Sequence, residues 1–162
     1  MKLSKKLEKA LNDQIKKEYE ASYVYNGMRI YLDDANLKGA SSWMLKQTQE
    51  ELEHAEAFVQ FVKSLDGQVK LEDIKAQKTE YAGLLEVLEA AYEHEQMITK
   101  SIQDLLELAI SEKNYATENF LRKFVDEQVE EEDNFRDLIE LVKFVGKNKA
   151  GLLKVDGGLG QR

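Results

Sequence analysis

Cysteine and proline are both absent from this chain of 162 residues, and histidine occurs only twice. Without cysteine, the chain can form no disulfide scaffold, thiolate zinc site, iron–sulfur cluster or cysteine nucleophile. A metal site would therefore have to use oxygen and nitrogen ligands. Because proline is the strongest helix breaker, its absence predicts long uninterrupted helices.

Long apolar runs and an excess of basic residues are missing as well. No segment approaches the ~18 uninterrupted apolar residues of a membrane-spanning helix. Residues 1–14 mix charge with helical spacing and lack the apolar core of a secretory signal. We therefore expect a cytoplasmic protein with no membrane partner. Acidic residues outnumber basic ones 31 to 23, for a net charge of −8, so nucleic acid is a poor partner because phosphate binding needs a basic surface.

Apolar residues recur at a spacing of three to four, which is the period of a helix with one buried face. The pattern predicts four long helices and one short one, over about 4–33, 36–65, 83–110, 114–145 and 147–155. The last residues, 156–162, contain three glycines and are expected to be loose. A chain of this length is expected to form a single domain over 1–162.

The connections predict how the four long helices are arranged. Only short turns join the first helix to the second and the third to the fourth, so each pair must be antiparallel. The connection over 66–82 can stretch ~56 Å at ~3.3 Å per residue, which is enough to run the full length of the helices. The predicted fold class is all-α, a four-helix bundle with one long crossover plus a short fifth C-terminal helix.

The core-facing row of each long helix is apolar at its ends and polar in its middle. Each row carries one glutamate near the helix midpoint: Glu18, Glu51, Glu95 and Glu131. Since the midpoints of antiparallel helices of equal length meet at one height, these carboxylates should converge. No lysine or arginine occupies the four rows, so an internal salt bridge cannot offset their burial. Two divalent ions would balance the four negative charges.

The residue types at this height also indicate which metal is suitable. His54 follows Glu51 by three positions, so both side chains lie on one helix face and can hold the same ion. Carboxylates with one imidazole and no sulfur suit iron or manganese, although zinc would bind too. A single glutamate on such a row is more often a solvated edge residue, and a non-catalytic bundle therefore stays open as an alternative.

Three stretches resemble those of the prokaryotic non-haem ferritins, a family of ferritin-like di-iron bundles. They are QEELEHAE over 49–56, YEHEQMIT over 92–99 and DEQVEEE over 126–132, with Glu18 one helix earlier. The resemblance implies that the first iron is held by Glu18, Glu51 and His54. It further implies that Glu51 bridges to a second iron, which is held also by Glu95 and Glu131.

The resemblance implies further site residues around that pair. Gln128 would be a hydrogen-bond partner of bound oxygen species, and Tyr25 would lie next to the centre, where simple core packing is its alternative role. A third iron site, on the cavity side, would be formed by Glu50, Glu127 and Glu130. The remaining histidine and the single tryptophan, His94 and Trp43, lie off the core rows, and we expect packing roles for both.

One motif and one further residue depart from related patterns. Gln128 and Glu131 stand where the generic di-iron pattern has Glu-x-x-His, which weakens ligation of the second iron and fits a site that passes iron onward. Leu52 occupies the place of the haem-ligating methionine of bacterioferritins, so no haem is expected.

The function implied by the resemblance is that of an iron-storage ferroxidase. Such an enzyme oxidises Fe²⁺ to Fe³⁺ with O₂ or peroxide at a buried di-iron centre. It then stores the product as a ferric mineral inside a homo-oligomeric shell of 24 subunits. A non-storage di-iron oxidase, expected to be a monomer or dimer, is the alternative within the same chemistry.

Overall fold

A computed structural model describes residues 2–162 of the chain. Its elements are five helices: α1 (Lys5–Asp34), α2 (Lys38–Ser64), α3 (Leu84–Ser111), α4 (Tyr115–Val145) and α5 (Lys149–Leu159). The bounds of α1 to α4 lie within two residues of those predicted from the apolar spacing. The predicted fold class, a four-helix bundle with a short fifth helix, is confirmed.

Local sequence signals explain where α1 and α4 begin and where the chain reverses in its two tight turns. The Ser4 hydroxyl accepts a hydrogen bond from the backbone N–H of Leu7 at 3.0 Å, and the Asn114 side chain accepts one from Thr117 at 3.1 Å. These are N-caps, which satisfy backbone donors that the first turn of a helix leaves free. Asn36 and Lys113, in the two tight turns, adopt the left-handed backbone conformation with φ of 62° and 55°, which lets the chain reverse within a few residues.

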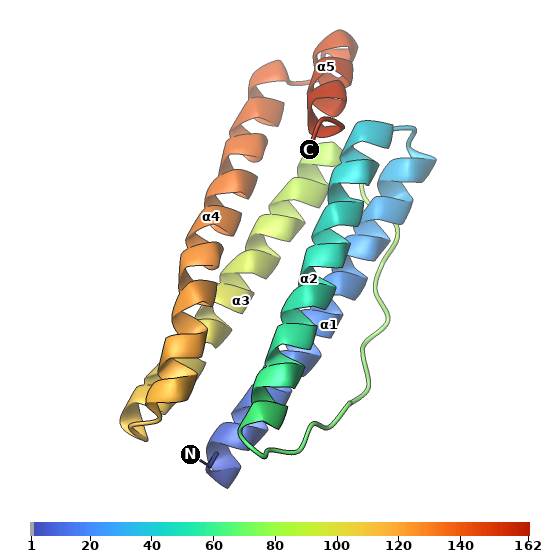
Figure 1. The fold of residues 1–162 in the computed structure, drawn as a ribbon. Helices are drawn as coiled ribbons and strands as arrows, with labels where there is room; N and C mark the ends of the chain where they lie inside the picture. Colours follow the sequence, from blue (N-terminus) through green and yellow to red (C-terminus); the bar gives the residue numbers. More distant parts are fainter. Residues whose placement is uncertain (1) are drawn as a thin grey trace.

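The long connection between α2 and α3 runs the length of the bundle on its outside (Figure 1). The Asn12 side chain accepts a hydrogen bond from the backbone N–H of Lys70 at 2.7 Å and donates one to the Gln68 carbonyl at 2.9 Å. Further along, a Cβ added at Gly27 would lie 2.5 Å from the carbonyl oxygen of Lys78. A glycine on α1 therefore allows the crossover to lie directly against that helix.

Two separate apolar clusters fill the bundle, one toward each end. One includes Met28, Trp43 and Phe135, and the other includes Leu11 and Phe58. The polar middle of the core rows lies between these clusters, as the sequence predicts. The fold thus holds a buried polar layer at mid-height, with water kept away from both ends of that layer.

The segment over 156–162 is not loose, which corrects the sequence-based expectation. Helix α5 continues to Leu159, and both Val155 and Leu159 are buried. The Asp156 carboxylate accepts hydrogen bonds from the backbone N–H groups of Gly39 at 3.2 Å and Ala40 at 2.7 Å. It thereby caps α2, whose own N-cap residue has no side-chain hydrogen bond.

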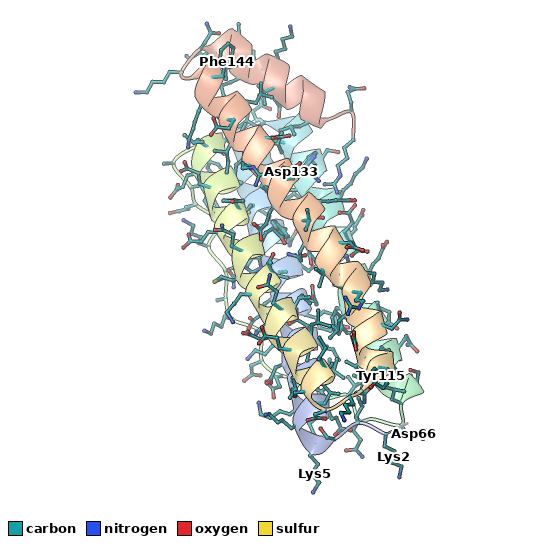
Figure 2. The ribbon with its side chains drawn as sticks, turned by 90° about the vertical axis from the view of Figure 1, so that its left-hand side faces the viewer. Lys2, Lys5, Asp66, Tyr115, Asp133 and Phe144 are labelled. Atoms are coloured by element: carbon teal, nitrogen blue, oxygen red, sulfur yellow. The ribbon has the colours of Figure 1, made fainter. Side chains whose placement is uncertain are left out.

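The outside of the molecule is mostly polar. Figure 2 shows Asp133 midway along α4, with Tyr115 and Phe144 toward opposite ends of that helix. Phe144 is the most exposed of the large apolar residues at 87%. Within residues 2–162, no helix is both long and apolar enough to cross a membrane.

Candidate metal centre

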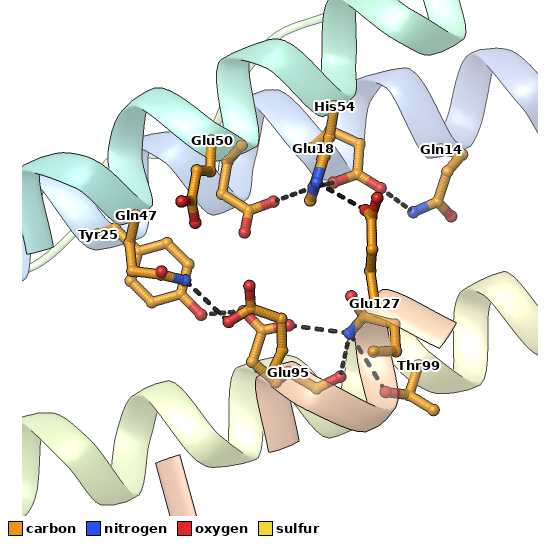
Figure 3. Close-up of polar contacts among 12 residues, drawn as sticks. Gln14, Glu18, Tyr25, Gln47, Glu50, His54, Glu95, Thr99 and Glu127 are labelled. Carbon is orange, nitrogen blue, oxygen red and sulfur yellow. Dashed lines mark hydrogen bonds and ion pairs between the residues drawn. The ribbon is translucent and has the colours of Figure 1, made fainter. Parts of the chain in front are cut away.

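Side chains from all four long helices meet in the polar layer between the apolar clusters. Those from the antiparallel pair α1 and α2 face those from α3 and α4 across a central space (Figure 3). The four glutamates and His54 predicted for this layer are all found there, together with Tyr25 and Gln128. Glu18, Glu51 and Glu95 are each at most 2% exposed, so the bundle removes their carboxylates almost completely from water.

Glu18, Glu51 and His54 form the most compact part of the layer. Each offers one ligand atom, and these atoms all lie within 4.8 Å of one another. His54 Nδ1 is 3.3 Å from Glu51 Oε2 and 3.8 Å from Glu18 Oε2. Gln14 Nε2 donates to Glu18 Oε1 at 2.7 Å, whereas the buried Glu18 Oε2 has no hydrogen-bond partner among residues 2–162. An unpaired carboxylate oxygen beside an imidazole and a second carboxylate suits a cation.

Glu95 and Glu131 are held by uncharged donors from neighbouring helices. The Tyr25 hydroxyl donates to Glu95 Oε1, and Gln128 Nε2 donates to Glu95 Oε2 at 2.9 Å. Gln47 Nε2 donates to Glu131 Oε2 at 3.1 Å. In the described chain these two glutamates lie outside the compact group of three. They lie on the opposite side of the layer, and none of their hydrogen-bond donors carries a positive charge.

Burial dominates the electrostatics of these carboxylates. It raises the pKa of Glu18 to about 8, with the neighbouring Glu51 adding to the effect. Burial and the nearby Glu95 raise the pKa of Glu51 well above its usual value. Burial also raises the pKa of Glu131 to about 7, and Glu95 contributes again. Each upward shift means that the surroundings do not offset the negative charge of the ionised carboxylate. A divalent cation would offset that charge.

The three residues predicted for a third site are not gathered into one group. Glu127 Oε2 lies 3.0 Å from His54 Nε2, at the rim of the compact group. Glu50 instead pairs with Arg162, whose Nη2 lies 2.6 Å from Glu50 Oε2. Glu130 is exposed on α4. The first two therefore border the buried layer, but each is directed to a different partner.

Tyr25 is fully buried and connects the polar layer to the apolar cluster beside it. Its ring stacks on Phe135, with centroids 6.1 Å apart, and His94 packs against it edge-on at 5.9 Å. Burial, followed by the nearby Glu95, raises the pKa of Tyr25 well above its usual value, so the hydroxyl stays a donor. Burial lowers the pKa of His94 to about 4. Trp43 packs edge-on against Phe135 at 5.2 Å, so both off-row aromatic residues pack as expected.

Sequence reasoning missed several residues that orient the ligands. Gln14 and Gln47 each precede a core glutamate by four positions, so they lie one helical turn away on the same face. That spacing was the available signal for Gln14, which donates to Glu18, whereas Gln47 donates to Glu131 on another helix and the spacing gives no sign of it. Thr99 follows Glu95 by four positions, lies 3.2 Å from Gln128 Nε2 and donates to a further glutamate on α4.

Comparison with known proteins agrees with this geometry. A family model described as a ferritin-like domain matches residues 8–145. A bacterial non-haem ferritin of Campylobacter jejuni is 38% identical over 154 residues, covering 95% of this chain and 92% of that protein. One of Bacteroides fragilis is 38% identical over 160 residues, 99% of each chain. An open-pore ferritin of the archaeon Archaeoglobus fulgidus superposes with a TM-score of 0.97 at 42% identity, covering 99% of this chain and 98% of that one. The chain therefore belongs to the ferritin family, among its prokaryotic non-haem members.

Proposed function

We propose that this protein is a ferroxidase that binds Fe²⁺ in the buried polar layer, oxidises it, and stores the product. The observation that carries the proposal is the compact group of Glu18, Glu51 and His54, with the unpaired Glu18 Oε2 directed into it. Carboxylate oxygens with one imidazole nitrogen match the ligand preference of iron. Membership of the ferritin family supports the same assignment.

In this proposal, Glu18, Glu51 and His54 hold the first Fe²⁺. Glu51 reaches toward a second Fe²⁺, which Glu95 and Glu131 also hold. Two Fe²⁺ ions lose one electron each, and O₂ takes up both electrons and two protons to give hydrogen peroxide. Peroxide can serve as the oxidant in the same way, and two electrons with two protons then convert it to two molecules of water. The protein supplies orientation, charge neutralisation and a pocket shielded from water.

The hydrogen-bond donors in this layer are uncharged, which favours the binding of cations by its carboxylates. Gln14, Gln47, Gln128 and Tyr25 each donate a hydrogen bond to one of the core carboxylates. They fix the carboxylate positions without adding positive charge, so the four carboxylates, once a metal displaces their protons, match the charge of two divalent ions. We infer that Gln128, which cannot act as an anionic ligand, leaves the second iron weakly held and so favours its release after oxidation.

We further propose that Glu50, Glu127 and Glu130 form an outer cation position through which iron leaves the pair. Oxidised iron would then collect as a ferric mineral inside a homo-oligomeric shell, for which the family leads us to expect 24 subunits. The similarity to the open-pore ferritin of Archaeoglobus fulgidus supports assembly of this kind. Size-exclusion chromatography tests it directly, because a monomer or dimer would favour the non-storage oxidase instead.

The test of the ferroxidase reaction is an aerobic titration with Fe²⁺, followed by the ultraviolet absorbance of ferric iron. Glu51→Ala and Glu95→Ala should each slow oxidation strongly, because each removes a proposed ligand. Glu56→Ala is the matched control, since Glu56 lies on α2, is exposed and pairs with Gln60. Oxidation by both site variants at the parental rate would refute the proposal. Absence of metal-dependent stabilisation in the parent would favour a non-catalytic bundle.

A further inference from the structure

Arg162 is held in place at the edge of the polar layer by three contacts. Its Nη2 lies 2.6 Å from Glu50 Oε2, and its Nη1 donates to the Trp43 carbonyl oxygen at 3.4 Å. Its guanidinium carbon lies 4.5 Å from the centroid of the Trp43 ring. A guanidinium that both stacks on an aromatic face and pairs with a carboxylate is oriented more strictly than a lysine ammonium would be.

The packing of α5 determines the position of Arg162. Asp156 caps the start of α2, and Leu159 is buried in the apolar cluster around Trp43. A Cβ added at Gly39 would lie 1.8 Å from the Asp156 carbonyl oxygen, and one added at Gly160 would lie 3.2 Å from the Gly39 Cα. The two backbones therefore touch where α5 ends, and this contact directs the next residues along α2 toward Glu50.

Glu50 connects Arg162 to the metal centre. It immediately precedes Glu51, one of the proposed iron ligands, and its charge helps to raise the pKa of Glu131 across the layer. The positive charge of Arg162 acts on Glu131 in the opposite direction, toward a lower pKa. Arg162 and Glu50 therefore both act electrostatically on the site from its rim.

Glu50 differs from the other two residues of the proposed outer position. Within residues 2–162, it is the only one of the three that pairs with a permanently charged side chain. Glu127 lies beside the imidazole of His54, and Glu130 has no ion pair in the described chain. A guanidinium and a metal ion compete for the same carboxylate oxygens and repel each other, so Glu50 can serve one of them at a time.

We propose that Arg162 is a positioning residue that holds Glu50 away from the outer cation position and thereby keeps that position weak. This inference rests on the proposed function, because it assumes a cation route past Glu50. The consequence is that the segment following α5, through Arg162, regulates how readily a cation leaves or enters the centre. Removing the guanidinium should strengthen cation binding at the rim without altering the inner ligands.

Calorimetric titration of the intact, metal-free protein with Zn²⁺ tests this proposal. Zn²⁺ has no redox chemistry and accepts both oxygen and nitrogen ligands. Arg162→Gln should tighten the outer Zn²⁺ site about threefold, the size expected for loss of one partly exposed ion pair. The inner site of Glu18, Glu51 and His54 should keep its affinity and serve as the internal reference, whereas the site that includes Glu131 is not used for this purpose because Arg162 acts on that residue. Arg162→Lys, which retains the charge, should lie nearer the parent.

Two further variants separate this role from a general effect of charge or folding. Arg122→Gln is the matched control, because Arg122 pairs with Glu118 on α4 at 2.5 Å, and it should change nothing. In a Glu50→Gln background, Arg162→Gln should have no further effect. Unchanged or weaker outer binding in Arg162→Gln, or an equal change in the Glu50→Gln background, would overturn the proposal. If Glu51→Ala leaves Zn²⁺ binding at the inner sites unchanged, the proposed function is refuted instead.

Discussion

Glu18 shows how neighbouring side chains position a single buried carboxylate. One of its oxygens accepts from Gln14, and the other is buried without a hydrogen-bond partner in the described chain. The contacts continue outward, since the Ser101 hydroxyl donates to Gln14 Oε1 at 2.5 Å and accepts from the exposed Lys17 at 2.6 Å. The neutral side chains of Gln14 and Ser101 therefore form a hydrogen-bond relay that fixes the carboxylate. The cation at the outer end of this relay, Lys17, stays at the surface.

Gln14→Leu tests this relay. The substitution keeps the volume of the side chain but removes the donor to Glu18 Oε1, so the carboxylate should lose its fixed orientation. We expect the affinity for the first Fe²⁺ to fall about tenfold, the scale on which groups that orient metal ligands act. Anaerobic Fe²⁺ calorimetry measures it. Gln60→Leu is the control, because Gln60 donates to Glu56 on the exposed face of α2 at 2.6 Å. Parental affinity in Gln14→Leu would show that the relay has no such role.

At this scale, the sequence predicted which side chains share the buried layer better than it predicted their hydrogen-bond partners. Glu18, Glu51 and His54 follow from helical spacing alone, because residues on one row of a helix share a face. The hydrogen bond from Tyr25 to Glu95 joins α1 to α3 across the core, and Arg162, three residues beyond the end of α5, reaches Glu50 on α2. Such contacts depend on the relative heights of helices and on side-chain rotamers, which spacing within one helix does not determine.

At the scale of elements, α5 and α2 depend on each other. The first turn of α2 lacks a side-chain cap of its own, and the Asp156 carboxylate supplies one from α5. A carboxylate at a helix N-terminus also interacts favourably with the helix dipole. Gly39 permits this contact, because any larger residue would collide with the backbone of α5.

Asp156→Ala should therefore destabilise the protein by about 1 kcal/mol, the usual loss when an N-cap is removed. The loss should appear as a lower midpoint of urea-induced unfolding. Asp137→Ala is the control, because Asp137 is exposed on α4 and should leave the midpoint unchanged. If Asp156→Ala unfolds at the parental urea concentration, the cap contributes nothing to stability.

The bounds of the five helices show where the sequence-based prediction of the fold succeeded and where it failed. Helices α1 to α4 follow a clear apolar period, and their bounds were predicted closely. Helix α5 was predicted to end at 155, because Gly157 and Gly158 each disfavour a helix by about 1 kcal/mol relative to alanine. Burial of Leu159 and the capping contact of Asp156 outweigh that preference. Both are tertiary contacts with α2 and its neighbours, which no local pattern reveals.

At the scale of the whole molecule, the bundle encloses carboxylates whose ionised form it does not compensate. The apolar clusters on both sides of the polar layer keep water away from Glu18, Glu51 and Glu95. Replacing buried charges often stabilises a protein when no partner compensates them. The metal-free molecule therefore carries a repulsion that ligand binding removes, so folding stability and metal binding are coupled.

This coupling predicts the direction in which folding stability changes with pH. The pKa of Glu18 is about 8 in the folded protein, against a usual value of 4.5, so the folded state binds the extra proton between those limits. The stabilisation that this proton gives is complete below pH 4.5 and is lost as the pH rises through about 8. The raised pKa of Glu131, about 7, acts in the same direction.

The melting temperature of the metal-free protein should therefore fall between about pH 6 and about pH 8.5. Thermal unfolding in a chelator measures this fall. Glu51→Gln should make the fall shallower, because it removes one of the repelling charges. With Zn²⁺ in place of the chelator, the fall should shrink or reverse, since metal binds the ionised carboxylates and competes with protons. A metal-free protein that is equally stable at both ends of the range would mean that water or counterions reach the layer and compensate its carboxylates.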